Sequence, residues 1–187
     1  SPLSGLTFRE SLYNGVASDR INRQFRFCPR SDGMFNIGSL SYHIGEEERH
    51  HGYYAVGYAL GSSPSETSAD KTFNYALWTL IEQPLLHIGE SHLGAMWQGG
   101  TSPASRSTCR HYWGAGLIWS NIPPRMTQVG LVVNRALYAD GRETDVELTG
   151  SFPVCNHFTL QPAVHCINTN GNYTAAAQLR AILEFGN

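Results

Sequence analysis

Carboxylates, amides and imidazoles alternate with apolar side chains along the second half of this sequence of 187 residues. In the segment 142–154, for example, Asp145 and Glu147 alternate with Val146 and Leu148. Neighbouring side chains of an extended strand point to opposite faces, so this spacing gathers the polar groups on one face. Such a face can hold a sugar, whose hydroxyls bind carboxylates and amides while its C–H groups pack on aromatic rings.

We select as candidate solute-binding residues the polar and aromatic side chains that lie opposite the apolar stripe of the predicted strands. They are Trp78, Glu82, Gln98, Tyr112, Asp145, Glu147, Gln161, His165, Arg180 and Glu184. In the alternative interpretation, Glu147, Arg180 and Glu184 only neutralise one another across neighbouring strands of a narrow, plugged interior. Both interpretations stay open at this point.

Period-two alternation also predicts the elements that position these side chains. The expected strands are 6–16, 33–44, 50–61, 71–83, 86–98, 108–119, 126–138, 142–154, 157–165 and 173–185. Long polar connections at 17–32, 62–70 and 99–107 alternate with short ones at 45–49, 84–85, 120–125 and 154–156. We therefore predict one all-β domain over residues 1–187, with about ten antiparallel strands.

Strand length favours a membrane barrel over a soluble β-sandwich, which would show the same alternation. The candidate strands reach roughly 11–13 residues, whereas sandwich strands average ~5–6 and tilted membrane-crossing strands need ~9–11. Short turns at one end and longer loops at the other are typical of outer-membrane barrels. We therefore predict an antiparallel transmembrane β-barrel of outer-membrane type, in contact with the lipid of a bacterial outer membrane. Any secretory signal is expected to have been removed already.

The composition agrees with this fold class and excludes others. The chain holds 8 Phe, 9 Tyr, 4 Trp and 19 Gly with only 15% charged residues, which suits β-strands joined by Gly-rich turns. No run approaches the ~18 consecutive apolar residues of a transmembrane helix. A net charge of -2, with Lys71 as the only lysine, provides no basic surface for nucleic acid.

Large aromatic side chains fall on the apolar parity of the strands. Trp97, Trp113, Trp119, Tyr54, Tyr58 and Tyr75 would form an aromatic girdle at a membrane interface, or would pack in the core of a soluble fold. Arg135 breaks the apolar pattern between Val133 and Leu137. Near an external strand end it would snorkel to water, whereas near the bilayer midplane it would cost about 2–4 kcal/mol.

Catalytic and metal chemistry have weaker signals. A hydrolase would use Ser151 and His157 with Asp145 or Glu147 as the orienting group, but no nucleophile elbow surrounds a serine. The four cysteines lack metal-ligand spacing, and the histidine pair at 50–51 is interpreted as part of a solvated connection. We therefore predict no enzymatic activity, no metal site and no cofactor.

Three stretches in the second half of the sequence carry a family resemblance. They are GAGLIWSNIPPRMTQVGLVV (114–133), DVELTGSFPVCNHFTLQPAVHCINTNGN (145–172) and AAAQLRAILEF (175–185), with NYALWTLIEQPLL (74–86) upstream. In order and spacing they resemble the C-terminal half of the OprB-type carbohydrate-selective porins. The family's Leu-Gln-Pro segment matches residues 160–162, and its Asn-Gly loop matches Asn170-Gly171. Gln128 departs from the family, which has an acidic residue there, and the length is about half that of a sixteen-stranded porin.

The resemblance implies an outer-membrane protein that passes or binds small carbohydrates without covalent chemistry. Arg125, which matches the turn arginine of the family, joins the candidate solute-binding residues on this basis. The expected partners are lipid, small sugars, and other copies or subunits of a membrane assembly. The half length favours an alternative, in which a porin-derived structural subunit has lost transport and serves as an interaction surface.

The topology also predicts where the cysteines lie. Cys28, Cys109 and Cys166 are expected at the external end of the barrel, and Cys155 is expected, unpaired, at a short periplasmic turn. We predict a Cys28–Cys109 disulfide, because a long loop that carries Cys28 can fold over the mouth of the barrel. A bond between Cys155 and Cys166 would contradict a continuous strand between them.

Overall fold

Ten β-strands make up almost all of the described chain. The computed structural model describes residues 5–15, 29–44, 52–64, 71–103, 107–123 and 126–184. The strands are β1 (Leu6–Asn14), β2 (Met34–His43), β3 (Tyr53–Pro64), β4 (Lys71–Ile88), β5 (Ser91–Thr101), β6 (Cys109–Ile122), β7 (Met126–Tyr138), β8 (Arg142–Cys155), β9 (Phe158–Thr169) and β10 (Asn172–Leu183). One helical turn, α1 (Pro29–Asp32), precedes β2. Among the described helices none is long and apolar enough to cross a membrane.

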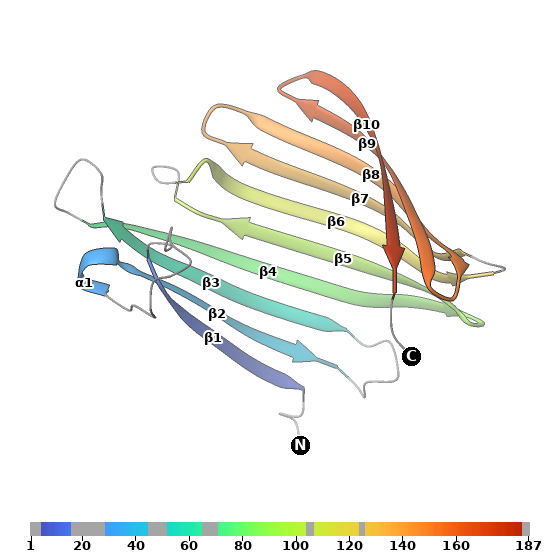
Figure 1. Ribbon diagram of the computed structural model, residues 1–187, viewed down its shortest axis with the longest axis horizontal. Coiled ribbons are helices and arrows are strands. Elements are labelled where there is room, and N and C mark those ends of the chain that lie inside the picture. Colours follow the sequence, from blue (N-terminus) through green and yellow to red (C-terminus); the bar gives the residue numbers. More distant parts are fainter. Residues whose placement is uncertain are drawn as a thin grey trace.

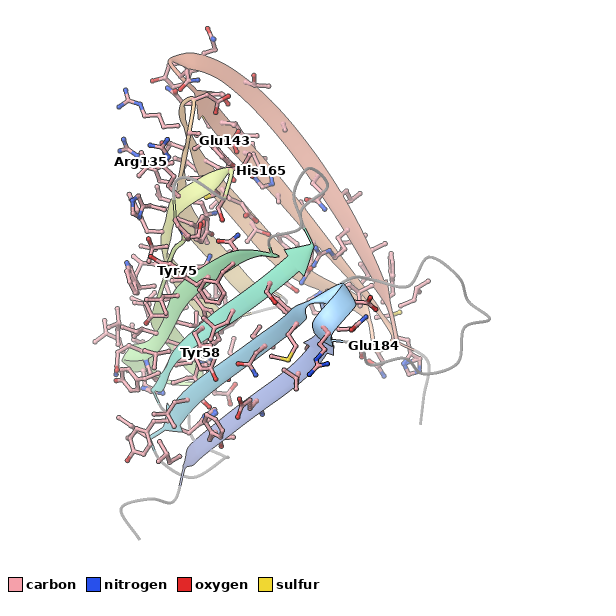
Figure 2. All side chains as sticks on the ribbon, turned by 90° about the vertical axis from the view of Figure 1, so that its left-hand side faces the viewer. Tyr58, Tyr75, Arg135, Glu143, His165 and Glu184 are labelled. Carbon is pink, nitrogen blue, oxygen red and sulfur yellow. The ribbon has the colours of Figure 1, made fainter. Side chains whose placement is uncertain are left out.

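The strands form one antiparallel sheet in which each strand pairs with its neighbours in sequence. Within the described residues, β1 pairs only with β2 and β10 pairs only with β9, so both edges of the sheet are unpaired. Figure 1 shows these two strands at opposite edges of the sheet. Figure 2 shows that the sheet is strongly curved, with His165 on its concave side and Arg135 on its convex side. The prediction of about ten antiparallel strands in an all-β fold is confirmed.

The two faces of the sheet differ in chemistry. One row of directly opposite residues crosses four strands on what we call the outer face: Leu117, Leu131, Leu148 and Val164. All four side chains are about half exposed, between 47% and 56%. The residues of opposite parity, which include Gln128, Glu147 and His165, form the inner face. The alternation in the sequence therefore becomes one apolar face and one polar face.

No hydrophobic core covers either face within the described residues. The buried hydrophobic side chains there are only Ala55 and Ala163, and no large side chain is fully buried. A β-sandwich would bury one face of this sheet under a second sheet. The described chain is instead a single layer, and many of its large apolar side chains remain exposed.

The predicted connection at 84–85 is wrong, because these residues lie inside β4. The strand continues to Ile88, the turn is Gly89–Glu90, and β5 begins at Ser91. Pro84 has no backbone N–H to donate, and the pairing with β5 shifts register between Pro84 and Leu86. A proline at a bulge of this kind interrupts the ladder without ending the strand.

The other boundaries agree more closely with the sequence. The strand predicted at 126–138 coincides with β7. Residues 62–64 and 99–101, predicted as connections, extend β3 and β5. Asn170 and Gly171 join β9 to β10 with positive φ angles of 53° and 96°, as a two-residue type I′ hairpin requires.

The cysteines follow the predicted positions where the structure describes them. Cys109, Cys155 and Cys166 are free thiols, and β9 runs without a break through Cys166. Cys155 ends β8 and is unpaired, as predicted. Cys28 lies outside the described residues. Because Cys109 is a free thiol, the predicted disulfide between Cys28 and Cys109 is not formed in this structure.

A single engineered cysteine tests the register between β8 and β9. Val146 lies directly opposite Cys166, whereas Leu148 lies opposite Val164. Opposite Cβ atoms are about 4.5–5.5 Å apart and diagonal ones farther, so only the first pair approaches disulfide geometry. With the other three native cysteines replaced by serine, Val146→Cys should form an intramolecular disulfide with Cys166 on oxidation. Peptide mapping checks this, and Leu148→Cys is the matched control. Preferential linkage in the control would show that the register is shifted.

Candidate solute-binding face

Nine of the sequence-predicted candidates share the inner face. The register places Trp78, Glu82, Gln98, Tyr112, Asp145, Glu147, Gln161, His165 and Arg180 there. Glu184 follows β10, is exposed, and donates its backbone N–H to the carbonyl oxygen of His157 at 3.0 Å. Arg125 lies outside the described residues.

A continuous series of polar side chains crosses five strands of the inner face. Gln98 on β5 donates from Nε2 to the Tyr112 hydroxyl at 2.6 Å, and that hydroxyl donates to Asn134 Oδ1 at 2.7 Å. Asn134 lies directly opposite Asp145, whose Oδ2 is 3.1 Å from His165 Nδ1. We call these five residues the polar belt. Buried or half-buried hydrogen bonds of this kind fix side-chain orientation.

The sequence reasoning missed Asn134 as a site residue, although it had placed Asn134 on the polar side of its strand. The alternation alone could have found it. What the alternation could not show is the alignment of Asn134 with Tyr112 and Asp145, since that depends on the register of three strands.

Gly114 provides the space that the polar belt occupies. A Cβ atom at this position would lie 2.4 Å from Asn134 Oδ1 and 3.1 Å from Gln98 Nε2. Both distances are shorter than ordinary contacts, so a side chain here would displace the amides. The glycine in the middle of β6 is therefore required by the polar network beside it.

Beside the polar belt, the inner face has a hollow that extends over β6 to β10. The side chains that line the hollow include Gln128, Glu147, Ser151, Gln161 and Arg180. In the part of the chain that the structure describes, no ion pair joins Glu147, Arg180 and Glu184. Their charges are therefore available to a solute in this structure, and mutual neutralisation by direct contact is not seen.

Asp145, Glu147 and His165 bring three possible metal ligands together. One ligand atom from each lies within 4.8 Å of the others, and all three side chains are partly buried. Asp145 Oδ1 is buried and has no hydrogen-bond partner among the described residues. These residues come from two neighbouring strands, in which Glu147 lies directly opposite His165.

The structure separates the two residues that a hydrolase would have needed to bring together. Ser151 lies on β8 opposite Gln128. His157 is exposed in the turn beyond Cys155, where β8 ends. Four residues of strand cover about 13 Å, so the serine hydroxyl and the imidazole are not in contact.

Arg135 lies at the outer-face position that the alternation predicted. It is opposite Trp113 and Thr144 and three residues before the end of β7. Its Nε atom is buried without a hydrogen-bond partner in the described chain. Arg135 therefore lies near a strand end, beside the connection from β7 to β8.

Comparison of the chain with protein-family models, with curated proteins and with solved structures found no match.

Two glycine substitutions test the space that the polar belt requires. Gly114→Ala should lower the free energy of unfolding by about 1–3 kcal/mol, because the new methyl group displaces Asn134 and breaks its hydrogen bond. Gly94→Ala is the matched control on β5, since a Cβ there meets its nearest atom at 3.6 Å. Urea titration of the folded protein measures both.

A second substitution identifies the cause of the loss. In an Asn134→Ala background the clash is removed, so Gly114→Ala should cost much less than it does in the unaltered chain. Equal costs in the two backgrounds would show that Asn134 is not the group that requires Gly114.

Proposed function

We propose that this chain forms the wall of an outer-membrane β-barrel whose inner face binds and passes small carbohydrates. The observation that carries the proposal is the single-layer sheet, apolar on the outer face and polar on the inner face, with no core in the described residues. The sequence resemblance to OprB-type porins supports the same function. No chemical step on the solute is involved.

The outer face supports contact with lipid. The row from Leu117 to Val164 is uncharged and crosses β6 to β9 through directly opposite positions. A soluble protein rarely leaves so many adjacent apolar side chains in water. Strands β6, β7 and β8 have 14, 13 and 14 residues, which exceeds the ~9–11 that a tilted strand needs to cross the hydrocarbon layer.

The inner face supports binding of a sugar. The polar belt offers amide, hydroxyl and carboxylate groups along one line, and Arg180 and Gln161 add donors in the hollow beside it. Trp78 lies on the same face and supplies an aromatic surface for the C–H groups of a sugar ring. Several weak contacts of this kind retain a solute without holding it tightly.

Conductance in a planar bilayer tests the proposal. The chain should form channels whose ion current falls when maltose is added. Arg180→Gln should raise the maltose concentration for half block by about 3- to 10-fold, because it removes a charged hydrogen-bond donor from the hollow. Arg142→Gln is the matched control, since Arg142 lies on the other face at the start of β8. A current that is absent, or indifferent to maltose, would contradict carbohydrate passage.

A polar cluster on the outer face favours a second candidate function, that of a subunit in a larger outer-membrane assembly. Glu10, in the middle of β1, accepts a hydrogen bond from Asn36 Nδ2 at 3.1 Å, and the Tyr58 hydroxyl lies 3.5 Å away. A carboxylate is unfavourable against the middle of a lipid layer. This region and the unpaired edge of β1 beside it therefore suit contact with another protein chain.

The native mass of the detergent-extracted protein distinguishes this second candidate. If β1 to β3 form an interface, the unaltered chain should be oligomeric and Glu10→Ala should increase the monomeric fraction, because the interface loses a carboxylate that could bond to polar groups of the other chain. Arg9→Ala is the control on the opposite face of β1. A monomer that inserts as a closed barrel would remove the main reason for this candidate.

A further inference from the structure

We propose that Asp145, Glu147 and His165 form a binding site for a divalent transition-metal ion of the Zn²⁺ class on the concave face of the sheet. This site goes beyond the proposed carbohydrate function and does not depend on it. The sequence pattern predicted no metal site, because the four cysteines lack metal-ligand spacing and the histidine pair at 50–51 falls in a predicted connection.

The positions of the three ligand groups follow from the pairing of β8 and β9. Asp145 and Glu147 are two residues apart on one strand and therefore share a face. His165 is directly opposite Glu147, and its Nδ1 lies 3.1 Å from Asp145 Oδ2. Figure 2 shows His165 on the concave side of the sheet, pointing away from Arg135. Register thus brings the imidazole of His165 to two carboxylates, of which Asp145 is 20 positions away in sequence.

The separations suit a small cation. Two ligand atoms that bind zinc at about 2.0–2.1 Å in a tetrahedron lie about 3.3 Å apart. The nitrogen of His165 and the nearer oxygen of Asp145 are 3.1 Å apart, and all three ligand atoms are within 4.8 Å of one another. Small rotations of the Glu147 side chain would close the remaining gap.

A second observation is the unsatisfied carboxylate oxygen. Asp145 Oδ1 is buried and has no hydrogen-bond partner among the described residues. A buried carboxylate oxygen without a partner is costly, and a bound cation would satisfy it. Within the described residues the ion pair of Asp145 is with His165 alone.

The donor set selects the class of ion. Imidazole nitrogen with carboxylate oxygens suits zinc and other first-row divalent ions, whereas Ca²⁺ takes six to eight oxygen ligands. Three protein ligands leave further coordination positions for water or for hydroxyl groups of a solute on the concave face. The ion would be bound at one end of the polar belt by its members Asp145 and His165, and Asn134 of the belt lies opposite Asp145.

Titration of the folded, untagged chain with ZnCl₂ tests the site by calorimetry. We expect one saturable site. Asp145→Asn, Glu147→Gln and His165→Asn should each weaken the Zn²⁺ affinity by more than about tenfold, because even the loss of a second-shell hydrogen bond costs that much. X-ray absorption of the zinc complex should show one imidazole nitrogen and carboxylate oxygens at about 2.0–2.2 Å.

Matched controls separate the site from general charge effects. Glu143→Gln removes a carboxylate from the same face of β8, and His157→Asn removes an exposed imidazole from the following turn. Both should bind Zn²⁺ like the unaltered chain. Circular dichroism verifies that each variant has the same β-structure. The proposal is overturned if the unaltered folded chain binds no Zn²⁺, if His165→Asn binds it with unchanged affinity, or if Ca²⁺ displaces it at equal concentration.

Discussion

Backbone hydrogen bonding between neighbouring strands holds this structure together, because no second layer packs on the sheet in the described residues. Each strand from β2 to β9 is paired on both sides, and only β1 and β10 present unpaired edges. In most soluble domains the apolar face of a sheet is buried against another element, which supplies much of the free energy of folding. Here that face is exposed across β6 to β9, so the stability of the sheet depends on what surrounds the chain. The proposed contacts with lipid or with another subunit would cover that face.

The same single layer explains the character of the inner face. Side chains on a concave surface approach one another more closely than those on a convex one, so small residues are needed between large polar ones. Gly114 fulfils this role beside Gln98 and Asn134. The polar belt and the hollow with Arg180 therefore exist because small, apolar and polar positions alternate in a fixed register. A slip of one residue would move every polar group to the outer face.

The two faces bear on function in different ways. On the inner face, the polar belt carries the proposed binding of carbohydrate, and two of its members, Asp145 and His165, form the proposed metal site together with Glu147. A bound cation there would add positive charge to a region that carries Asp145, Glu147 and Glu143, and would change which solutes the face attracts. On the outer face, the hydrogen-bonded cluster of Glu10 and Asn36 places a carboxylate in the middle of a strand, next to the free edge of β1.

Much of the fold could be predicted from the sequence, because a period-two pattern is local. The alternation alone determined the all-β class, the limits of β7, and the face on which Glu147 and Arg180 lie. It failed at Pro84, because a bulge inside a long strand and a turn between two strands have the same local signal. The Asn-Gly turn between β9 and β10 was evident because its φ angles require those residue types.

Only the tertiary structure decided which polar residues meet. The contact of Tyr112 with Asn134 joins residues 22 positions apart, and that of His165 with Asp145 joins residues 20 positions apart. Neither the curvature of the sheet nor its unpaired edges has a local signal in the sequence. Alternation fixes the face of each side chain, whereas the ladder of backbone hydrogen bonds fixes its neighbours across the strands. The sequence therefore determined the chemistry of each face, and the register of the strands decided where that chemistry is concentrated.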